Sequence, residues 1–249
     1  PIAGAGRYAI DQPPRQQLSR KQMNETLSTI FTDILPQYGY TVRENQIGLA
    51  EHILETISRR AISLAESEVG TGKTMAYLVA AVLAKRGRLN DFWLCGHYLQ
   101  QSYAETAHMP VVIATSSIAL QRAIIQDYIP ALSDILMTHG IINTPLTCVI
   151  RKGKEHFICE RRLHSFNHDV DTETQTILQP LLSLGASCDL ADAEGLTPYI
   201  KRKICISGSC GERCRFYNNC RYQRYMKRAN DSRVDFLVCN HNYYLADIL

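Results

Sequence analysis

The sequence predicts an α/β fold in which the strands of a parallel sheet alternate with helices. In residues 61–85, a strand-length apolar run, a glycine-rich turn and an Ala/Leu/Val-rich helix follow one another. In residues 110–121, a second apolar run is followed by the start of a helix, which we expect to stop near Pro130. Strand, turn and helix repeated in this order are typical of a doubly wound sheet, which binds its ligand at the carboxyl ends of the strands.

The turn in the first of these segments has the composition of a phosphate-binding loop. Between a predicted buried strand at 61–65 and a predicted helix at 75–85, the chain reads Glu66-Ser67-Glu68-Val69-Gly70-Thr71-Gly72-Lys73-Thr74. In such loops the glycines let backbone N–H groups converge on phosphate oxygens, a lysine neutralises the β- and γ-phosphates, and a hydroxyl ligates Mg²⁺. Lys73 and Thr74 are the candidates for the last two roles, at the positive end of the helix that follows. The pattern departs at its first glycine, where Ser67 stands.

Length and composition are those of a globular protein. The chain has 249 residues, of which 45% are hydrophobic, enough for one large or two modest domains. It contains no apolar run of bilayer-spanning length and nothing like a signal peptide, so we expect a cytoplasmic protein without a membrane partner. Nine cysteines, an odd number, argue against a disulfide framework in such a chain and favour ligation of a metal or cluster by some of them.

Positive charge is concentrated in one part of the chain. Residues 201–233 hold ten Lys or Arg against two acidic residues, a local balance of +8 that leaves −5 for the rest of a chain of net charge +3. Aromatic residues are interleaved with them: Phe216, Tyr217, Tyr222 and Tyr225. Positive charge follows phosphates and aromatic faces stack on bases, so the segment predicts a channel for single-stranded nucleic acid. The alternative is a solvated basic helix that packs its aromatic side chains inward.

The cysteines in the second half of the chain include a candidate metal-binding set. Cys159 stands alone, and Cys205, Cys210, Cys214 and Cys220 follow after a long insertion. One distant and three close thiolates can hold either a [4Fe–4S] cluster or tetrahedral zinc, and the spacing does not choose between them. The other cysteines are expected to be small buried apolar residues: Cys95, Cys148, Cys188 and Cys239.

Upstream of the loop, the sequence predicts a flexible leader and two helices. The leader is residues 1–18, which are rich in Gly, Gln, Arg and Pro. Residues 19–35 follow as an amphipathic helix that Pro36 ends, and a second helix opens at Gln46. The apolar face of the first helix is expected to be core: Met23, Leu27, Ile30, Phe31 and Ile34.

The order of these motifs resembles that of the XPD/DinG iron–sulfur helicases of superfamily 2, and the bacterial DinG type fits best. Residues 153–163 have the form GKxxxxCxRRL, and an insertion, a cysteine triplet, a helix and then Asn240-His241 follow as they do in that family. The resemblance covers most of the chain from about Tyr40 onward. It implies a partial RecA-like P-loop domain, with a parallel sheet and an inserted, mainly helical iron–sulfur cluster domain.

The resemblance also implies domain boundaries. The leader would be followed by the first part of RecA-like motor domain 1 at 19–150, the cluster domain at 151–233, and a return strand and helix of the motor domain at 234–249. No Asp-Glu-Ala-His box, which supplies the Mg²⁺ carboxylate in the family, occurs in the sequence. We therefore expect the amino-terminal part of a helicase whose second motor domain lies elsewhere in the full protein. The 249 residues alone should hydrolyse ATP feebly or not at all.

Residue roles for nucleotide and cluster binding follow from the same resemblance. Gln46 would read the edge of the adenine, with Tyr40 and Arg43 beside the nucleotide, as in the Q-motif of these helicases. The implied cluster ligands are Cys159, Cys210, Cys214 and Cys220, with Cys205 as an alternate for Cys210.

Two groups of residues are implied to contact DNA. Thr115, Ser117 and Gln121 match the element that touches the backbone of single-stranded DNA in the family, although Ser or Thr at a helix start is equally expected as an N-cap. The second group lies in the basic segment: Arg215, Tyr217, Arg221 and Arg224.

The function implied for the full protein is that of an ATP-dependent DNA helicase. It would use ATP and Mg²⁺, move 5′ to 3′ along single-stranded DNA, and unwind forked DNA or RNA–DNA hybrids. The competing hypothesis is a non-enzymatic nucleic-acid-binding module with a structural Cys₄ zinc and a vestigial P-loop. A P-loop kinase or switch ATPase without a nucleic-acid partner is a third hypothesis, which leaves the +8 segment unexplained.

Overall fold

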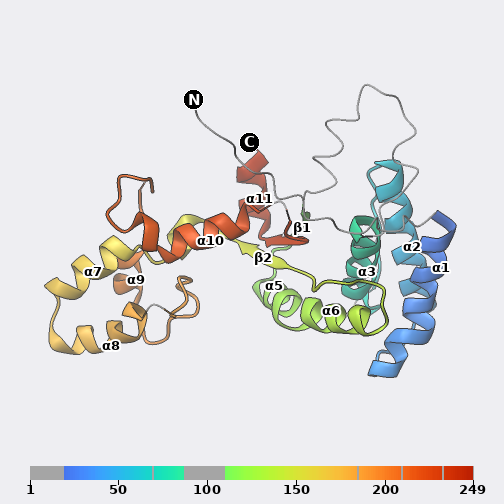
Figure 1. Cartoon of the computed structure of the whole chain (residues 1–249), viewed down its shortest axis with the longest axis horizontal. Helices are drawn as coiled ribbons and strands as arrows, with labels where there is room; N and C mark the ends of the chain where they lie inside the picture. Colours follow the sequence, from blue (N-terminus) through green and yellow to red (C-terminus); the bar gives the residue numbers. More distant parts are fainter. Residues whose placement is uncertain are drawn as a thin grey trace, which may run out of the picture. The chain divides into compact units, whose positions relative to one another are not determined.

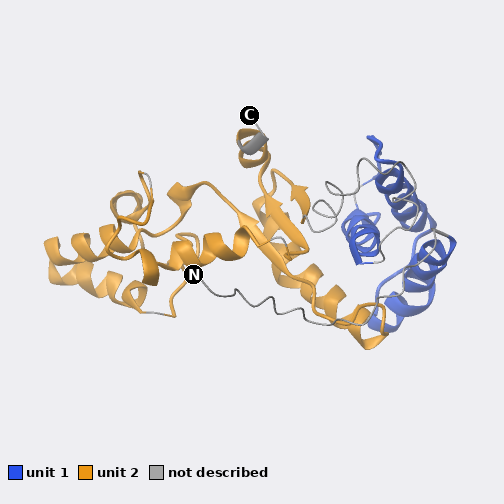
Figure 2. Cartoon of the chain, turned by 45° about the horizontal axis from the view of Figure 1, so that its top comes forward, with its two compact units in different colours: residues 1–107 blue, residues 108–249 orange. Residues whose placement is uncertain are grey.

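The computed structural model describes residues 20–68, 70–86, 110–183, 185–208, 210–231 and 233–248. The chain divides into two compact units, Pro1–Ala107 and His108–Leu249 (Figure 2). The expected leader 1–18 and Cys95 lie outside the described residues. No helix in the described segments is both long enough and apolar enough to cross a membrane.

The first unit consists of helices that pack on one another (Figure 1). Helix α1 (Arg20–Thr29) continues through a π-helical turn (Ile30–Ile34) and a 3-10 turn (Leu35–Tyr38), and the helices α2 (Glu44–Arg59) and α3 (Lys73–Arg86) pack beside it. The helical stretch runs through Pro36 and ends where Gly39 takes a φ of +82°. The predicted core face of the first helix is buried: Met23, Leu27, Ile30, Phe31 and Ile34.

The prediction of a buried strand at 61–65 is wrong. Residues 61–68 have no strand pairing, and Ile62 and Leu64 are 102% and 101% exposed. Ser63 instead lies against α2, where its Oγ is 2.5 Å from His52 Nε2. An apolar run becomes a strand only beside another strand, and the described residues of the first unit contain none.

The second unit contains a three-stranded parallel sheet in the order β1-β3-β2, which agrees with the predicted fold class. The strands are β1 (Val111–Ala114), β2 (Cys148–Arg151) and β3 (Phe236–Cys239). The last strand in sequence lies in the middle, so that Phe236 is opposite both Val111 and Cys148. Strands β1 and β3 fall in segments predicted as strands, whereas β2 was not predicted.

The helix after β1 does not stop at Pro130, as the sequence predicted. Helix α5 (Ile118–Ala123), a π-helical turn (Ile124–Tyr128) and α6 (Ile129–Thr138) form one continuous stretch. Pro130 occupies the first turn of α6. A proline lacks the N–H that a helix needs in its interior but not in its first turn, so the preceding π-helical turn lets the chain pass through it.

A buried carboxylate holds the starts of β2 and β3 together. Asp235 is 2% exposed and accepts hydrogen bonds from the backbone N and the Oγ1 of Thr147, at 2.8 and 3.0 Å. The carbonyl of Thr147 in turn accepts the N–H groups of Asp235 and Phe236. Burial, and then the charge of Asp235, raises the pKa of the Cys148 thiol to about 12, so this cysteine stays neutral.

Between β2 and β3 the chain forms a group of helices that covers its own core. Helices α7 (Glu160–Asp169), α8 (Thr172–Leu182) and α9 (Pro198–Ile204) enclose a cluster that includes Leu163, Leu178 and Ile204. Two 3-10 turns (Lys154–His156 and Tyr217–Asn219) flank this group. Helix α10 (Arg221–Ala229) then leads back to the sheet, and α11 (His241–Ile248) follows β3 (Figure 1).

Candidate functional site

The start of α2 and the glycine-rich loop meet in the first unit. Gln46 is the third residue of α2 and is 7% exposed, and its Nε2 donates a hydrogen bond to the carbonyl oxygen of Gly72 at 2.9 Å. Gly72 has a φ of +78°, and a Cβ there would lie 2.3 Å from the same Nε2. Only glycine meets both conditions without strain. Arg43 also approaches the loop, because its Nη1 lies 3.9 Å from the Cβ position of Gly70.

Polar groups inside the loop bond to one another. The hydroxyls of Ser67 and Thr71 are 2.6 Å apart, and Thr71 Oγ1 donates to the carbonyl of Glu68 at 2.9 Å. The ammonium group of Lys73 donates to the carbonyls of Ser67 and Glu68, the latter at 3.1 Å. Ser67, which stands where the motif has glycine, therefore closes the loop with its side chain.

The predicted phosphate and metal residues lie at the start of α3. Lys73 is exposed and Thr74 is half-buried, and both belong to the first turn. The first turn of a helix leaves backbone N–H groups without intrahelical partners, next to the positive end of the helix dipole. The loop therefore offers an ammonium group, a hydroxyl and N–H donors within a few residues. Tyr40 is half-buried, and its backbone N–H bonds to Leu35.

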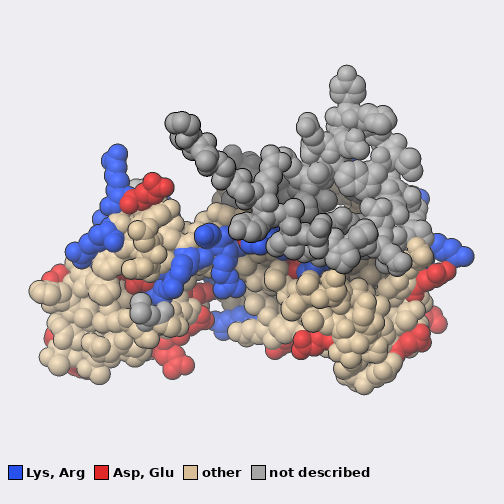
Figure 3. All heavy atoms as spheres, viewed as in Figure 1, with Lys and Arg blue, Asp and Glu red and all other residues tan. Residues whose placement is uncertain are grey.

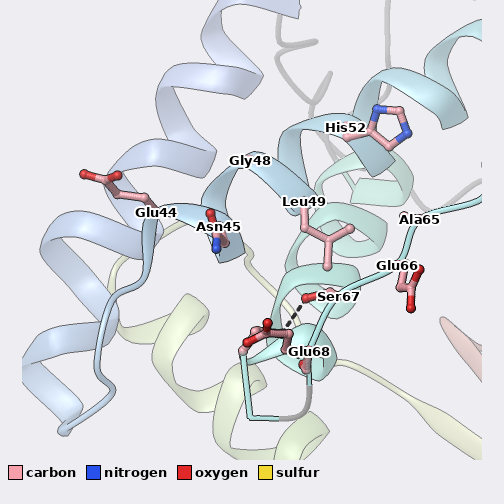
Figure 4. Close-up of a pocket in the computed structure, with 10 residues that line it drawn as sticks. Glu44, Asn45, Gly48, Leu49, His52, Ala65, Glu66, Ser67 and Glu68 are labelled. Atoms are coloured by element: carbon pink, nitrogen blue, oxygen red, sulfur yellow. Dashed lines mark hydrogen bonds between the residues drawn. The ribbon is translucent and has the colours of Figure 1, made fainter.

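A cavity of ≈ 610 Å³ lies between α2 and the loop (Figure 4). In Figure 4, Leu49 points from α2 towards Ser67. The lining residues are Glu44, Asn45, Gly48, Leu49, His52, Ala65, Glu66, Ser67, Glu68 and Thr71. Gln46 is not among them because its amide nitrogen is turned to Gly72. Its role as a reader of adenine stays a prediction.

The predicted DNA contacts after β1 make local hydrogen bonds. Ser117 is the N-cap of α5, with its Oγ accepting the N–H of Leu120 at 3.1 Å, and its own N–H donates to Thr115 Oγ1 at 3.2 Å. The N-cap interpretation is therefore confirmed. Gln121 is 4% exposed and its Nε2 donates to the carbonyl of Thr115 at 2.8 Å. This corrects the assignment of Gln121 as a DNA contact, because its side chain faces the protein interior.

The Asn-His pair after β3 joins the carboxyl ends of two strands. His241 Nε2 lies 3.1 Å from the carbonyl oxygen of Ala114, the last residue of β1. Asn240 Oδ1 accepts the N–H of Tyr243 at 2.6 Å, at the start of α11. In the sequence, this dipeptide was noted only as part of the resemblance. Its contact with Ala114 could not be predicted, because the two residues are 127 positions apart and no local pattern connects them.

The predicted cluster ligands lie around the starts of two helices. Cys159 is the N-cap of α7 and Cys220 that of α10, and Cys214 lies in a turn where its N–H bonds to Gly211 at 3.0 Å. Burial, and then the neighbouring thiols of Cys159, Cys220 and Cys214, raises the pKa of the Cys210 thiol. The Cys210 thiol is thus close enough to the other three for their charge to affect it.

Cys205 lies in the hydrophobic core, where its backbone pairs with Ile158, the residue before Cys159. It is 9% exposed, belongs to the core under α7 to α9, and donates from Sγ to the carbonyl of Arg202 at 3.4 Å. Cys188 is half-buried, and burial raises its pKa to about 11. Cys239 is buried in β3, as expected. The thiols of Cys159, Cys214 and Cys220 influence the Cys210 thiol, and the choice between Cys210 and Cys205 as a ligand stays a prediction.

As donors, the four cysteines fit a four-thiolate centre. Cys159 and Cys220 stand at helix N-termini, next to backbone N–H groups without intrahelical partners. Within the described residues, however, no three His, Cys, Asp or Glu side chains adopt a geometry that could hold a metal ion. Four thiols are suitable donors for a cluster. To bind one, the four cysteine side chains would have to move closer to one another.

Arg221, predicted as a DNA contact, is instead part of a buried ion pair. It is 7% exposed, and Nη2 lies 3.1 Å from Glu160 Oε2 on α7 while Nε bonds Oε1. Its Nη1 donates to the carbonyls of Ala186 and Ser187, at 3.2 and 3.4 Å. Arg221 therefore holds α10, α7 and the chain near residue 186 together, which corrects its assignment to DNA.

The tyrosines of α10 also pack inward, as the alternative interpretation predicted. The ring centroids of Tyr222 and Tyr225 lie 5.3 and 4.5 Å from that of Phe157, and the Tyr225 hydroxyl donates to the carbonyl of Ile150. Burial raises the pKa of both tyrosines above the usual value.

The opposite face of α10 is exposed and basic. It carries Arg224, Lys227 and Arg228, which follow the helical period. Figure 3 shows Lys and Arg side chains gathered over this helix. In the preceding turn Arg215 is exposed and Tyr217 is half-buried. The basic surface predicted from charge is therefore present. Arg215 and Arg224 contribute to it as predicted, whereas Arg221 does not.

Comparison with known proteins relates the chain to helicases. No family model matches it. The probable ATP-dependent helicase YpvA of Bacillus subtilis is 20% identical over 248 residues, which cover 92% of this chain and 34% of YpvA. The ATP-dependent helicase DinG of Mycobacterium tuberculosis is 25% identical over 246 residues, covering 88% of this chain and 34% of that helicase.

The chain is a distant homologue of the DinG and YpvA helicases. The 3′-5′ exonuclease DinG of Bacillus subtilis is also similar, with 25% identity over 148 residues that cover 59% of this chain and 13% of the exonuclease. The chain spans about a third of the length of the two helicases and a smaller share of the exonuclease. The resemblance to DinG-type helicases inferred from motifs is confirmed.

In this DinG homologue, the substitution Gly72→Ala should impair the loop. A left-handed φ costs a non-glycine residue about 1–2 kcal/mol, and the new Cβ would displace the Gln46 amide. We expect affinity for ATP analogues to fall by about tenfold, measured by calorimetry. The control Gly208→Ala adds a Cβ into open space at an exposed glycine of the other unit and should leave affinity unchanged. Equal affinity in both variants would contradict the close approach of Gln46.

The substitutions Arg221→Ala and Arg224→Ala should affect different properties, although the two residues lie one turn apart on α10. The first should lower stability and the second should weaken DNA binding. Loss of Arg221 leaves Glu160 buried and unpaired, which we expect to cost about 3–5 kcal/mol of unfolding free energy in urea. Loss of the exposed Arg224 should leave stability nearly unchanged and weaken DNA binding, most strongly at low salt. A stable Arg221→Ala variant with weakened DNA binding would restore the original assignment.

Proposed function

We propose that this chain is the part of a DinG-type ATP-dependent DNA helicase that binds the phosphates of ATP and a single strand of DNA. The observation that carries the proposal is the hydrogen bond from Gln46 to Gly72, which joins the Q-motif-like start of α2 to the glycine-rich loop. A chance glycine turn would not need a buried glutamine from 26 residues upstream. Distant homology to ATP-dependent helicases supports the same conclusion.

The loop residues account for phosphate binding. Gly70 and Gly72 have positive φ values, +82° and +78°, a backbone shape that turns N–H groups towards one point. The ammonium group of Lys73 donates to two loop carbonyls. When ATP binds, this group would donate to oxygens of the β- and γ-phosphates in their place. The Thr74 hydroxyl then ligates Mg²⁺. ATP hydrolysis further requires a carboxylate to position Mg²⁺, and the 249 residues contain no Asp-Glu-Ala-His box. This chain alone therefore binds ATP but hydrolyses it feebly or not at all.

The exposed basic face of α10 and the turn before it supply the DNA-binding surface. Arg224, with Lys227 and Arg228, follows the phosphates of a single strand, and Arg215 extends this surface towards the cysteines. Thr115 and Ser117 add polar contacts at the end of β1. In the full helicase, ATP hydrolysis drives movement 5′ to 3′ along DNA, which opens forked duplexes or RNA–DNA hybrids.

The four cysteines that would hold a [4Fe–4S] cluster, with zinc as the alternative occupant, are Cys159, Cys210, Cys214 and Cys220. A bound cluster supplies four metal–thiolate bonds that cross-link its ligands. Because Cys159 and Cys220 begin α7 and α10, their ligation adds to the Glu160–Arg221 pair that already joins these helices. The centre therefore fixes the direction in which α10 presents its basic face.

The substitution Lys73→Ala tests the nucleotide site. Removal of a charged donor to phosphate should weaken binding of ATP analogues by roughly 30- to 100-fold, the equivalent of about 2–3 kcal/mol. The control Lys21→Ala removes an exposed lysine from α1 in the same unit and should have no effect. Binding of single-stranded DNA should be unchanged in both. Unchanged nucleotide binding in Lys73→Ala would favour a vestigial loop, and robust DNA-stimulated ATPase in the unaltered chain would contradict its predicted inactivity.

Metal analysis of protein purified without oxygen tests the cysteine centre. We expect about four irons and four sulfides per chain, with visible absorption. Both should be lost in Cys159→Ser and retained in the control Cys205→Ser, because Cys205 lies in the hydrophobic core and its Sγ donates to the carbonyl of Arg202. One zinc and no iron under the same conditions would instead support the structural zinc module. Loss of iron in Cys205→Ser alone would reverse the choice between Cys205 and Cys210.

A further inference from the structure

Three flat side chains meet beside the cysteine-bearing turn, and they are here called the planar cluster: His164, Phe216 and Arg215. The imidazole of His164 is stacked with the ring of Phe216, with centroids 5.0 Å apart and planes inclined by 19°. The guanidinium carbon of Arg215 lies 4.8 Å from the centroid of Phe216. The cluster therefore brings together α7, which carries His164, and the turn that contains Cys214.

The planar cluster lies at the surface, outside the core of this part of the protein. His164 and Arg215 are exposed and Phe216 is half-buried. On α7 it is the adjacent residue, Leu163, that enters the core, with no exposed surface. The stack is thus not needed to fill the interior, and it holds two aromatic rings and a guanidinium group in a preformed planar arrangement at the solvent boundary.

Positive charge surrounds this planar surface. Arg161 is exposed and lies one turn before His164 on α7, and its charge reaches the Cys210 thiol in the facing turn. Arg213 and Arg215 are exposed in that turn, and Glu212, directly before Arg213, is the acidic neighbour. Three arginines against one glutamate favour an anionic ligand, and the flat groups favour one with planar apolar faces.

We propose that the planar cluster is a stacking site for an unpaired nucleobase of single-stranded DNA. A base extends the stack on the exposed imidazole of His164, and the adjoining phosphates contact Arg161 and Arg215. The inference rests on the proposed function and deepens it, since it assigns base contact, as distinct from phosphate contact, to particular side chains. His164 lies outside the basic segment, so the charge pattern of the sequence did not reveal it.

The chemistry of the site accounts for selection of single strands. Every base has a π-face, so stacking is tolerant of sequence and suits a protein that moves along DNA. In a duplex the base faces are already stacked on one another and only the backbone is available. The planar cluster therefore distinguishes single from double strands, whereas the basic face of α10 binds the phosphates of both.

The test compares two oligonucleotides of equal length and charge, one with normal bases and one abasic, by fluorescence anisotropy. The unaltered chain should bind the abasic strand about tenfold more weakly, as expected for the loss of base stacking. His164→Ala should bind the normal strand about tenfold more weakly than the unaltered chain does, and should no longer distinguish the two strands. His164→Tyr, which restores a flat ring without imidazole, should recover most of the affinity.

The matched control is His168→Ala, which removes an exposed histidine four residues further along α7 whose ring is 3.4 Å from Asp169. It should bind both strands as the unaltered chain does. Equal affinity of the unaltered chain for normal and abasic strands would overturn the stacking site while leaving phosphate binding, and hence the proposed function, in place. Equal losses in His164→Ala and His168→Ala would also overturn it. Absence of any DNA binding would overturn both the stacking site and the DNA-binding part of the proposed function.

Discussion

The parallel pairing of β3 between β1 and β2 is the constraint on which the second unit depends. Parallel strands cannot be joined by a tight turn, so the chain must leave the end of β2 and return to the start of β3 by a long crossover. The cysteine-bearing helices form that crossover, from residue 152 to residue 235. Their two ends are held at the sheet, by the Tyr225 hydroxyl on the carbonyl of Ile150 and by Asp235 on Thr147. Whatever binds to the crossover is therefore connected to the strand ends, where His241 joins β3 to β1.

Within the crossover, buried charge and helix starts organise the cysteines. The Glu160–Arg221 pair sets α7 against α10, and each helix begins directly after a cysteine, Cys159 or Cys220. Such a pair is costly to break because either partner alone would be a buried, uncompensated charge. It places two candidate ligands at neighbouring positive helix ends before any metal is bound. The turn that carries Cys210 and Cys214 lies close enough for the thiols of Cys159 and Cys220 to influence that of Cys210.

In the first unit, the nucleotide site depends on backbone shape and on one buried amide. The positive φ values of Gly70 and Gly72 open the loop, and Gln46 approaches Gly72 so closely that no side chain fits there. Lys73 and the hydroxyls of Ser67 and Thr71 satisfy the loop oxygens from within. The polar side chains of the loop thus have hydrogen-bond partners within the protein.

The sequence by itself determined the features that depend on local chemistry. Glycine spacing predicted the loop, helical periodicity predicted the core face of α1, and an apolar run predicted β1, because each depends on residues adjacent in the chain. The strand β3 was expected only from the resemblance to the helicase family. Only the tertiary structure decided which side chains are buried by distant partners. Arg221 and Arg224 are chemically identical in the sequence, yet Glu160, 61 residues away, draws the first inward. Cys205 likewise belongs to the core around Ile204, whereas Cys210 is exposed. Residues 61–65 are exposed because a strand needs a neighbouring strand, which the sequence pattern does not supply.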